Sequence, residues 1–90
     1  MKKRELVESI ARRAEGNPQE ADRYLTATLE TIAEALARGE SVPLPGFGSF
    51  SVVEREARYV RDPRNGEERL VPEGRRVKFK PGSRLKSLVY

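Results

Sequence analysis

A long basic ribbon is the feature that most constrains how this chain can fold. Arginine recurs at every third residue, at Arg55, Arg58, Arg61 and Arg64. The dipeptide Asn65-Gly66 follows, and it is the strongest short-range signal for a tight hairpin because both residues tolerate positive φ. The returning segment 76–80 alternates basic and apolar residues, which predicts a strand with one basic face and one apolar face. The sequence therefore predicts a two-stranded ribbon over residues 52–80, with its tip near 62–66.

The charge of the chain is concentrated in this ribbon. Residues 1–53 carry 7 basic and 8 acidic side chains, whereas residues 54–90 carry 11 basic and 6 acidic ones. The net charge of +4 thus comes entirely from the second segment. A local excess of this kind is typical of proteins that bind polyanions. The alternative is a solvated hairpin whose charges only keep the chain soluble.

The composition argues against several classes of function. The chain has no cysteine and no histidine, so the commonest metal ligands and the commonest general base are absent. It also has no glycine-rich phosphate loop of the nucleotide-binding kind. We therefore expect neither an enzyme nor a protein that carries a metal, a cofactor or a small-molecule substrate. No segment is apolar for long enough to cross a membrane, and we expect a soluble protein.

Two helices are predicted in the first forty residues. Apolar residues between Leu6 and Ala14 form one helical stripe, and Gly16 is expected to end that helix as its C′ residue. Asn17, Pro18 and Glu20 then match the N-cap, N1 and N3 positions of a second helix, which should end at Arg38-Gly39. A helix-turn-helix is an alternative, but both helices are rich in acidic residues and lack a basic face for a groove.

Short strands and a final helix are predicted after residue 40. Pro43 confines the segment 41–44 to a sheet edge or a strand end. In the run 45–50, two glycines alternate with two phenylalanines. The glycines allow a sharp turn, and the alternative is that its exposed amides also hold a phosphate. Ser83 is expected to cap the last helix, which should turn Leu85, Leu88 and Val89 inward.

The expected architecture is α+β: two helices, a three-stranded antiparallel sheet with a long β-ribbon arm, and a short C-terminal helix. We expect one domain over 1–90, with a helical dimerisation base (1–40), the sheet and arm (41–82) and the last helix (83–90). The body is too small to cover its apolar residues, so an intertwined dimer is expected. The predicted dimer core consists of Leu29, Ile32, Leu36, Leu44, Phe47, Phe50 and Phe79.

Three blocks of sequence resemble the bacterial HU/IHF family of DNA-bending proteins, and HU more closely. They are the run 46–50, the arm from Arg55 through Asp62-Pro63 to Glu67, and the segment from Phe79 to Lys86. HU and IHF are themselves standard examples of architectural DNA binders. The resemblance implies a dimer whose arms enter the minor groove. It also implies that Pro63, near the arm tip, intercalates between base pairs and bends the duplex.

The resemblance also implies the residues that contact DNA. Arg55, Arg58 and Arg61 match basic arm positions, Lys80 and Lys86 match body positions, and Lys3 matches an N-terminal phosphate contact. The chain departs from the family in having Asp62 before the proline, Val53 and Ser83 at commonly basic positions, and prolines at 43 and 45. Arg76 and Lys78 add charge, so we infer that phosphate contacts shift to the last strand. The full predicted DNA-binding set is Lys3, Gly46, Gly48, Ser49, Arg55, Arg58, Arg61, Pro63, Arg64, Arg76, Lys78, Lys80, Arg84 and Lys86.

The expected function is that of a homodimeric, nucleoid-associated protein in the bacterial cytoplasm. It would bind double-stranded DNA with little sequence specificity and bend it, with no membrane partner. Three alternatives remain open from the sequence. The first is an IHF-like, sequence-preferring bender, which includes a heterodimer subunit. The second is a protein-interaction module with an acidic partner, and the third is a binder of structured RNA.

Overall fold

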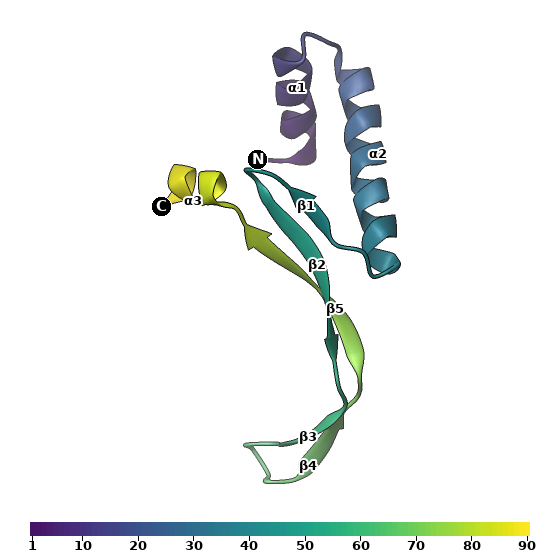
Figure 1. Cartoon of the computed structure of the whole chain (residues 1–90), viewed down its shortest axis with the longest axis vertical. Helices are drawn as coiled ribbons and strands as arrows, with labels where there is room; N and C mark the ends of the chain where they lie inside the picture. The colour runs from purple at the N-terminus through teal and green to yellow at the C-terminus, as the bar shows by residue number, and fades with distance from the viewer. The chain divides into compact units, whose positions relative to one another are not determined.

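A computed structural model describes the whole chain, residues 1–90, as three helices and five strands (Figure 1). The elements in order are α1 (Lys3–Arg13), α2 (Pro18–Ala37), β1 (Val42–Leu44), β2 (Gly48–Arg55), β3 (Arg58–Arg61), β4 (Glu68–Val71), β5 (Gly74–Pro81) and α3 (Ser83–Val89). The predicted α+β architecture is confirmed. The chain forms two compact units, residues 1–35 and residues 36–90. None of the three helices combines the length and the apolar character that crossing a bilayer demands.

The turn between α1 and α2 is built by helix caps. The Asn17 side chain accepts a hydrogen bond from the Glu20 amide at 2.9 Å, which confirms the predicted N-cap. At the end of α1, however, Glu15 takes the left-handed conformation (φ 56°), and Gly16 donates its amide to the Ala11 carbonyl at 2.9 Å. This pattern places Glu15 at C′ and Gly16 at C″. The prediction that Gly16 is the C′ residue is therefore wrong by one position.

The first unit has a small core. Val7 and Ala11 of α1 pack with Ala21 of α2, and Ile10 and Leu25 lie partly buried against them. Alanine at two of the three central positions lets the helices approach closely. This cluster is too small to stabilise the unit strongly on its own.

The second unit contains a three-stranded antiparallel sheet in the order β1-β2-β5. Pro43 of β1 pairs with Ser49 of β2. Strand β1 lies at the edge of the sheet, as the sequence predicts. Phe50 lies opposite Phe79, with ring centroids 4.8 Å apart, and the Phe47 ring centroid lies 5.7 Å from that of Phe79. These three rings form the apolar face of the sheet, and Phe47 and Phe79 are still exposed in the single chain.

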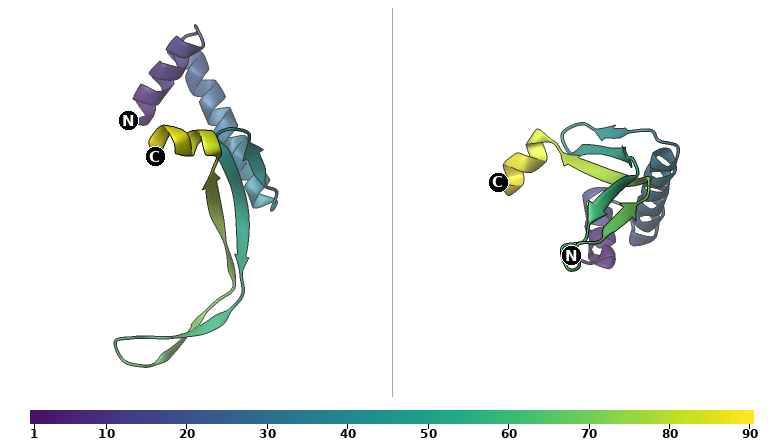
Figure 2. Two further views of the ribbon diagram at one scale, coloured as in Figure 1. Left: turned by 60° about the vertical axis from the view of Figure 1, so that its left-hand side comes forward. Right: turned by 90° about the horizontal axis from the view of Figure 1, so that it is seen from below.

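The sequence predicts a continuous ribbon over 52–80, and the structure shows instead that the ribbon is interrupted. The β2–β5 ladder ends at the pair of Arg55 and Gly74, and the β3–β4 ladder starts again at Arg58 and Val71. Pro72 has no amide proton, so the ladder cannot run through it. The ribbon changes direction at this break, which we call the arm root, and the β3–β4 segment beyond it is the arm (Figures 1 and 2).

The arm ends in a loop of residues 62–67 rather than in a tight Asn-Gly turn. Asp62 and Glu67 close the loop through a backbone hydrogen bond of 2.8 Å, and the Gly66 amide bonds to the Asp62 carbonyl at 2.8 Å. Only Gly66 has positive φ (73°), and Asn65 does not. The Asn65 side chain instead accepts the Glu67 amide at 2.9 Å. Asn65 thus favours a turn through its side chain and not through its backbone.

The last helix also differs from its prediction. Gly82, not Ser83, is the N-cap residue of α3, and no side chain caps this end. Leu85 is half-buried, but Leu88 and Val89 are 75% and 70% exposed in the single chain. Within one chain, therefore, only Leu85 of these three residues turns inward.

Candidate nucleic-acid interface

One face of the sheet carries a row of cations on a single strand. Lys80 pairs with Ser49, Lys78 with Ser51 and Arg76 with Val53, and residues paired in this way share a face. The three cations are exposed. At a rise of about 3.4 Å per residue, they stand about 7 Å apart along β5. The sequence predicted that charge lies on the last strand and not on its neighbour, and the register confirms this arrangement. We call Arg76, Lys78 and Lys80 the basic row.

A hollow lies at the end of this face, beside the start of α3. Leu44 to Phe47 form a turn closed by a 3.0 Å hydrogen bond, with Pro45 at the second position and Gly46 (φ 83°) at the third, the pattern of a type II turn. The hollow has a volume of about 500 Å³. Its polar and glycine lining includes Gly46, Gly48, Ser49, Lys80, Gly82, Ser83 and Lys86.

Close packing explains the glycine that follows this turn and begins β2. A side chain at Gly48 would meet the Phe79 ring at 2.5 Å and the Lys80 carbonyl oxygen at 2.7 Å. Gly48 is buried between them, so the strands can approach only because it has no side chain. Five of the predicted DNA-binding residues line this hollow together, namely Gly46, Gly48, Ser49, Lys80 and Lys86. Arg84 lies beside it, with Cδ 4.0 Å from where a Gly46 side chain would begin.

The loop at the end of the arm presents a proline. Pro63 is exposed, and the residue before it is turned into the loop: the Asp62 side chain is only 10% exposed. Its carboxylate accepts the Arg64 amide at 2.9 Å and lies 3.6 Å from Arg64 Nε. The Asp62 carboxylate is thus a turn-forming group and not a solvent-facing charge. The Arg64 side chain is still 85% exposed.

The two faces of the arm differ in charge. Arg58 pairs with Val71 and Val60 with Arg69, which places two arginines on one face. Tyr59 pairs with Leu70, and Arg61 pairs with Glu68 on the opposite face. The predicted contacts Arg58 and Arg61 therefore point to opposite sides of the arm. They can both reach phosphates only if nucleic acid surrounds the arm, as the two walls of a groove do.

Two arginines at the arm root interact within the protein. Arg55 donates from Nε to the Pro72 carbonyl at 3.3 Å. A side chain at Gly74, which pairs with Arg55, would lie only 2.9 Å from Arg55 Nη2. Arg75 donates to the carbonyls of Leu36 and Ala37, at 3.4 Å each, where α2 ends. Arg55 is thus the one predicted DNA-binding residue whose side chain bonds across the arm root.

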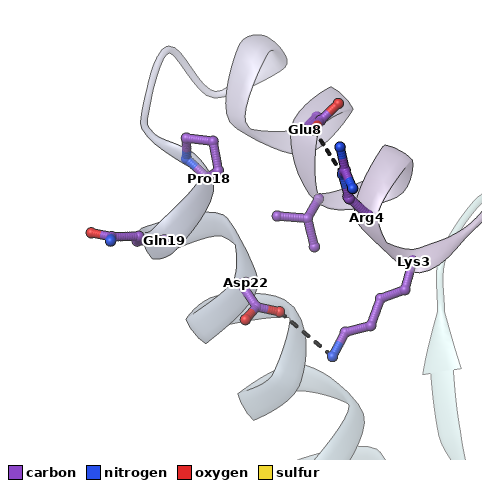
Figure 3. A pocket seen from close by; sticks show the side chains of 7 residues that line it. Lys3, Arg4, Glu8, Pro18, Gln19 and Asp22 are labelled. Carbon is purple, nitrogen blue, oxygen red and sulfur yellow. Dashed lines mark ion pairs between the residues drawn. The ribbon is translucent and has the colours of Figure 1, made fainter.

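Lys3 belongs to the first unit. It reaches from α1 to Asp22 of α2, with Nζ 3.6 Å from the carboxylate oxygen (Figure 3). Arg4 and Glu8 form a second ion pair of 3.7 Å beside it. These residues line an open hollow of about 530 Å³. The ion pairs are mostly exposed and contribute little to stability.

Sequence reasoning missed two arginines of the second unit. Arg69 lies on the same face of the arm as Arg58. The alternation of side chains along the returning strand would have predicted this position, once that strand was paired with the one that holds Arg58. Arg75 caps α2 from 38 residues away, and no local pattern predicts that contact.

A basic sheet face that continues into a β-ribbon is the architecture of a nucleic-acid binder that uses strands rather than a recognition helix. A comparison with known families agrees with this class. The family model for bacterial DNA-binding protein matches residues 1–90. The chain belongs to the bacterial DNA-binding protein family.

Its relatives carry the name HU. The chain is 43% identical over 89 residues to DNA-binding protein HU-1 of Halalkalibacterium halodurans, and 40% identical over 89 residues to DNA-binding protein HU of Geobacillus stearothermophilus, with 99% of each chain covered in both cases. Among solved structures, an Anabaena HU–DNA cocrystal superposes with a TM-score of 0.87 at 43% identity, over 99% of this chain and 97% of that one. HU from Thermotoga maritima superposes with a TM-score of 0.72 at 37% identity, over the full length of both chains.

Proposed function

We propose that this chain is an HU-like architectural protein of the bacterial nucleoid. It binds double-stranded DNA through phosphates and through the minor groove, with little sequence specificity, and it bends the duplex. Its working form is a homodimer in the cytoplasm, and no catalytic step is part of this function. The similarity to HU proteins, one of them solved with DNA, supports the proposal.

The observation that carries the proposal is that the strands bearing the basic row lead, through the arm root, into the arm. Arg76, Lys78 and Lys80 stand on one face of β5, and the ribbon that begins at the same strands ends in an exposed proline. The row offers regularly spaced charges to a phosphate backbone, and the arm offers a narrow, polar element that fits a groove.

Each predicted site residue other than Arg55, whose side chain bonds to the Pro72 carbonyl, then has a role. The phosphates of DNA that bends against the body are held by the basic row, by Arg84 and Lys86, and by the backbone at Gly46, Gly48 and Ser49. Arg58, Arg61 and Arg64 follow the groove, and Pro63 inserts between base pairs. Lys3 meets a phosphate of flanking DNA and leaves its exposed partner Asp22 to do so.

Assembly and organisation follow the same proposal. The apolar residues Leu29, Ile32, Leu36, Leu44, Phe47, Phe50 and Phe79 pack between two chains. Residues 1–40 form the dimerisation base, residues 41–82 the sheet and arm, and residues 83–90 the terminal helix, within one domain. Two arms on one dimer then hold the duplex from both sides.

A titration at fixed salt tests this function. The protein is added to a random straight duplex, to the same duplex with a nick, and to a four-way junction, with an RNA duplex of matched sequence and an acidic polypeptide as controls. We expect binding to the straight duplex and tighter binding to the nicked and junction DNA, because those sites already lack stacking that a bend must break. Equal or tighter binding to the acidic polypeptide or to the RNA duplex would overturn the proposal.

A further inference from the structure

The arm carries an exposed apolar pair. Tyr59 of β3 and Leu70 of β4 stand directly opposite each other in the ladder, so their side chains share one face of the arm, with Cβ atoms about 5 Å apart. Tyr59 is 72% exposed and Leu70 is 57% exposed. The arm is a sheet of two strands only, and it projects from the rest of the ribbon (Figures 1 and 2). We call Tyr59 and Leu70 the apolar pair.

Arginines surround this pair on both faces of the arm. Arg61 and its partner Glu68 follow on the same face, about 7 Å nearer the loop. Arg58 and Arg69 lie on the opposite face. All four charged side chains are exposed. A partner that satisfies these arginines has negative groups on both sides of the arm, and it must place an uncharged surface against the apolar pair.

The minor groove of a DNA duplex has this combination of surfaces. Its rims carry phosphates, and its walls between them are the C–H surfaces of deoxyriboses. The groove is about 6 Å wide, and its floor carries acceptors that A·T and T·A pairs share. A tyrosine ring can contact the apolar wall while its hydroxyl donates to an acceptor of this kind. Such a contact adds affinity without reading a base sequence.

An RNA duplex offers a different surface to the same pair. Its minor groove is wide and shallow, and it displays the 2′-hydroxyl of every ribose. Apolar side chains gain little there, because they would cover polar groups without replacing their hydrogen bonds. The apolar pair therefore favours deoxyribose over ribose.

A second protein chain, including another copy of this one, is a poorer occupant. A stable protein–protein interface buries about 800 Å² on each side. Two side chains among four charged ones do not supply that area. The pair is also continuous with predicted DNA contacts, since Arg58 precedes Tyr59 and Arg61 follows it on the same strand.

We infer that Tyr59 and Leu70 form an apolar contact with the deoxyriboses of the minor groove. This contact raises affinity for a DNA duplex independently of salt, and it gives the arm a preference for DNA over RNA. The inference rests on the proposed function, because it adds a contact to the same arm.

A double variant, Tyr59→Thr with Leu70→Thr, tests this contact. Threonine keeps the net charge and the strand propensity but removes most of the apolar surface. We expect affinity for a straight DNA duplex to fall about 10-fold at every salt concentration from about 50 to 200 mM, so that the slope of log affinity against log salt is unchanged. Affinity for an RNA duplex of matched sequence should change by less than about 2-fold.

Two controls separate apolar contact from charge and from damage to the arm. Tyr59→Phe with Leu70→Met keeps the apolar surface and should stay within about 3-fold of wild-type affinity for DNA. Arg58→Gln should instead flatten the salt slope by about 0.9 per chain. The inference is overturned if the threonine variant binds DNA as tightly as the wild type, loses affinity equally for DNA and RNA, or has a flattened slope.

A fluorescent reporter shows directly what covers the pair, because the chain has no tryptophan. Tyr59→Trp places the only indole on the arm, and Tyr24→Trp, on α2, is a control outside the predicted DNA contacts. On addition of straight duplex, the Tyr59→Trp emission should shift to shorter wavelength and become protected from acrylamide, while Tyr24→Trp should not change. No protection by DNA, or the same protection when the free protein is concentrated without DNA, overturns the inference.

The inference and the proposed function fail in different ways. Tight, salt-dependent binding of the wild type to DNA, with a threonine variant that matches it, contradicts only the inference. Wild-type binding to the RNA duplex or to an acidic polypeptide that equals binding to DNA contradicts the proposed function, and the inference with it.

Discussion

At the scale of single residues, Pro63 has two interpretations that the loop geometry helps to separate. A proline at this place can form the turn, or it can act as an apolar wedge for a base step. The loop, however, is closed by other groups: Asp62 accepts the Arg64 amide, Asn65 accepts the Glu67 amide, and Asp62 bonds to Glu67 through the backbone. The turn therefore does not depend on the proline ring, which favours the wedge.

Replacing Pro63 should accordingly separate bending from binding. In Pro63→Ala the arginines remain, so the salt slope should stay within about 0.5 of the wild-type value. The bend angle should fall, and the preference for nicked over straight duplex should weaken, because the unstacking cost of a few kcal/mol is no longer met by an inserted ring. Fluorescence transfer between the duplex ends measures the bend beside affinities for both DNAs.

Asp62→Ala is the control for the loop itself. It removes the acceptor that holds the Arg64 amide, so it should weaken binding to straight and nicked DNA alike. A Pro63→Ala protein that behaves in this uniform way, or that bends straight duplex as sharply as the parent, would show that the proline only forms the turn.

At the scale of elements, the basic row on β5 should supply a measurable share of the attraction to DNA. Replacing Arg76 and Lys78 together by glutamine should flatten the salt slope by up to about two units per chain. Filter binding or fluorescence anisotropy between 50 and 200 mM salt measures this slope.

The strand register offers a rescue for this variant. Ser51 lies opposite Lys78 on the same face, so Ser51→Lys in the double variant should restore about one unit of slope. Glu68→Gln, on the arm, raises the net charge by the same one unit away from this face. An unchanged slope in the double variant would mean that the row faces away from DNA.

The elements also show which parts of the fold a sequence can predict. The start of α2 was predictable because the Asn17 side chain acts only three residues away, within the reach of a local rule. The edge position of β1 followed from Pro43, for the same local reason. Pro72 could have predicted the break at the arm root, because proline cannot donate a ladder hydrogen bond. The clear alternation of 76–80 and the Asn-Gly signal instead indicated an uninterrupted hairpin.

Contacts between distant segments were beyond a sequence reading. The basic row required only period two and one antiparallel pair, and it was predicted correctly as a shared face. In contrast, the hydrogen bond from Arg55 to the Pro72 carbonyl depends on which residues stand across the ribbon, and the cap of α2 depends on Arg75, 38 residues away. Positions of this kind are fixed by register and not by local propensity.

The contact of Arg75 with α2 should contribute to stability. The last turn of α2 has no basic residue of its own, and Arg75 donates to the carbonyls of Leu36 and Ala37 where the helix dipole is negative. Arg75→Gln should lower the free energy of unfolding by about 1 kcal/mol, which is about 4–8 °C in melting temperature for a domain of this size.

Thermal unfolding at fixed protein concentration measures this effect. Arg69→Gln is the control, because it removes the same charge from the exposed arm and should change stability by less than about 0.5 kcal/mol. Equal melting temperatures in the two variants would mean that the contact with α2 contributes nothing.

At the scale of the whole molecule, the single chain buries very little. Only Val7, Ala11, Ala21, Ala35 and Leu36 are buried among the apolar residues, and no large side chain is fully enclosed. The chain exposes 7965 Å², whereas a monomeric protein of 10.2 kDa exposes about 5,300 Å². Folding should therefore depend on a second chain that covers the remaining apolar side chains.

Assembly and folding should then be one event, and Leu29 tests it. Leu29 is 54% exposed in the single chain, so glutamate there would be nearly neutral in a folded monomer. In a dimer that buries this side chain between subunits, Leu29→Glu should lower the free energy of unfolding by at least about 2 kcal/mol, because it places a charge in an apolar interface. Leu88→Glu, at a position 75% exposed and outside the predicted dimer core, should have little effect.

Mass action provides a second test of the dimer, since a tenfold rise in wild-type concentration should raise the apparent free energy of unfolding by about 1.4 kcal/mol. Sedimentation that finds a folded monomer at micromolar concentration, with Leu29→Glu as stable as Leu88→Glu, would contradict the dimer.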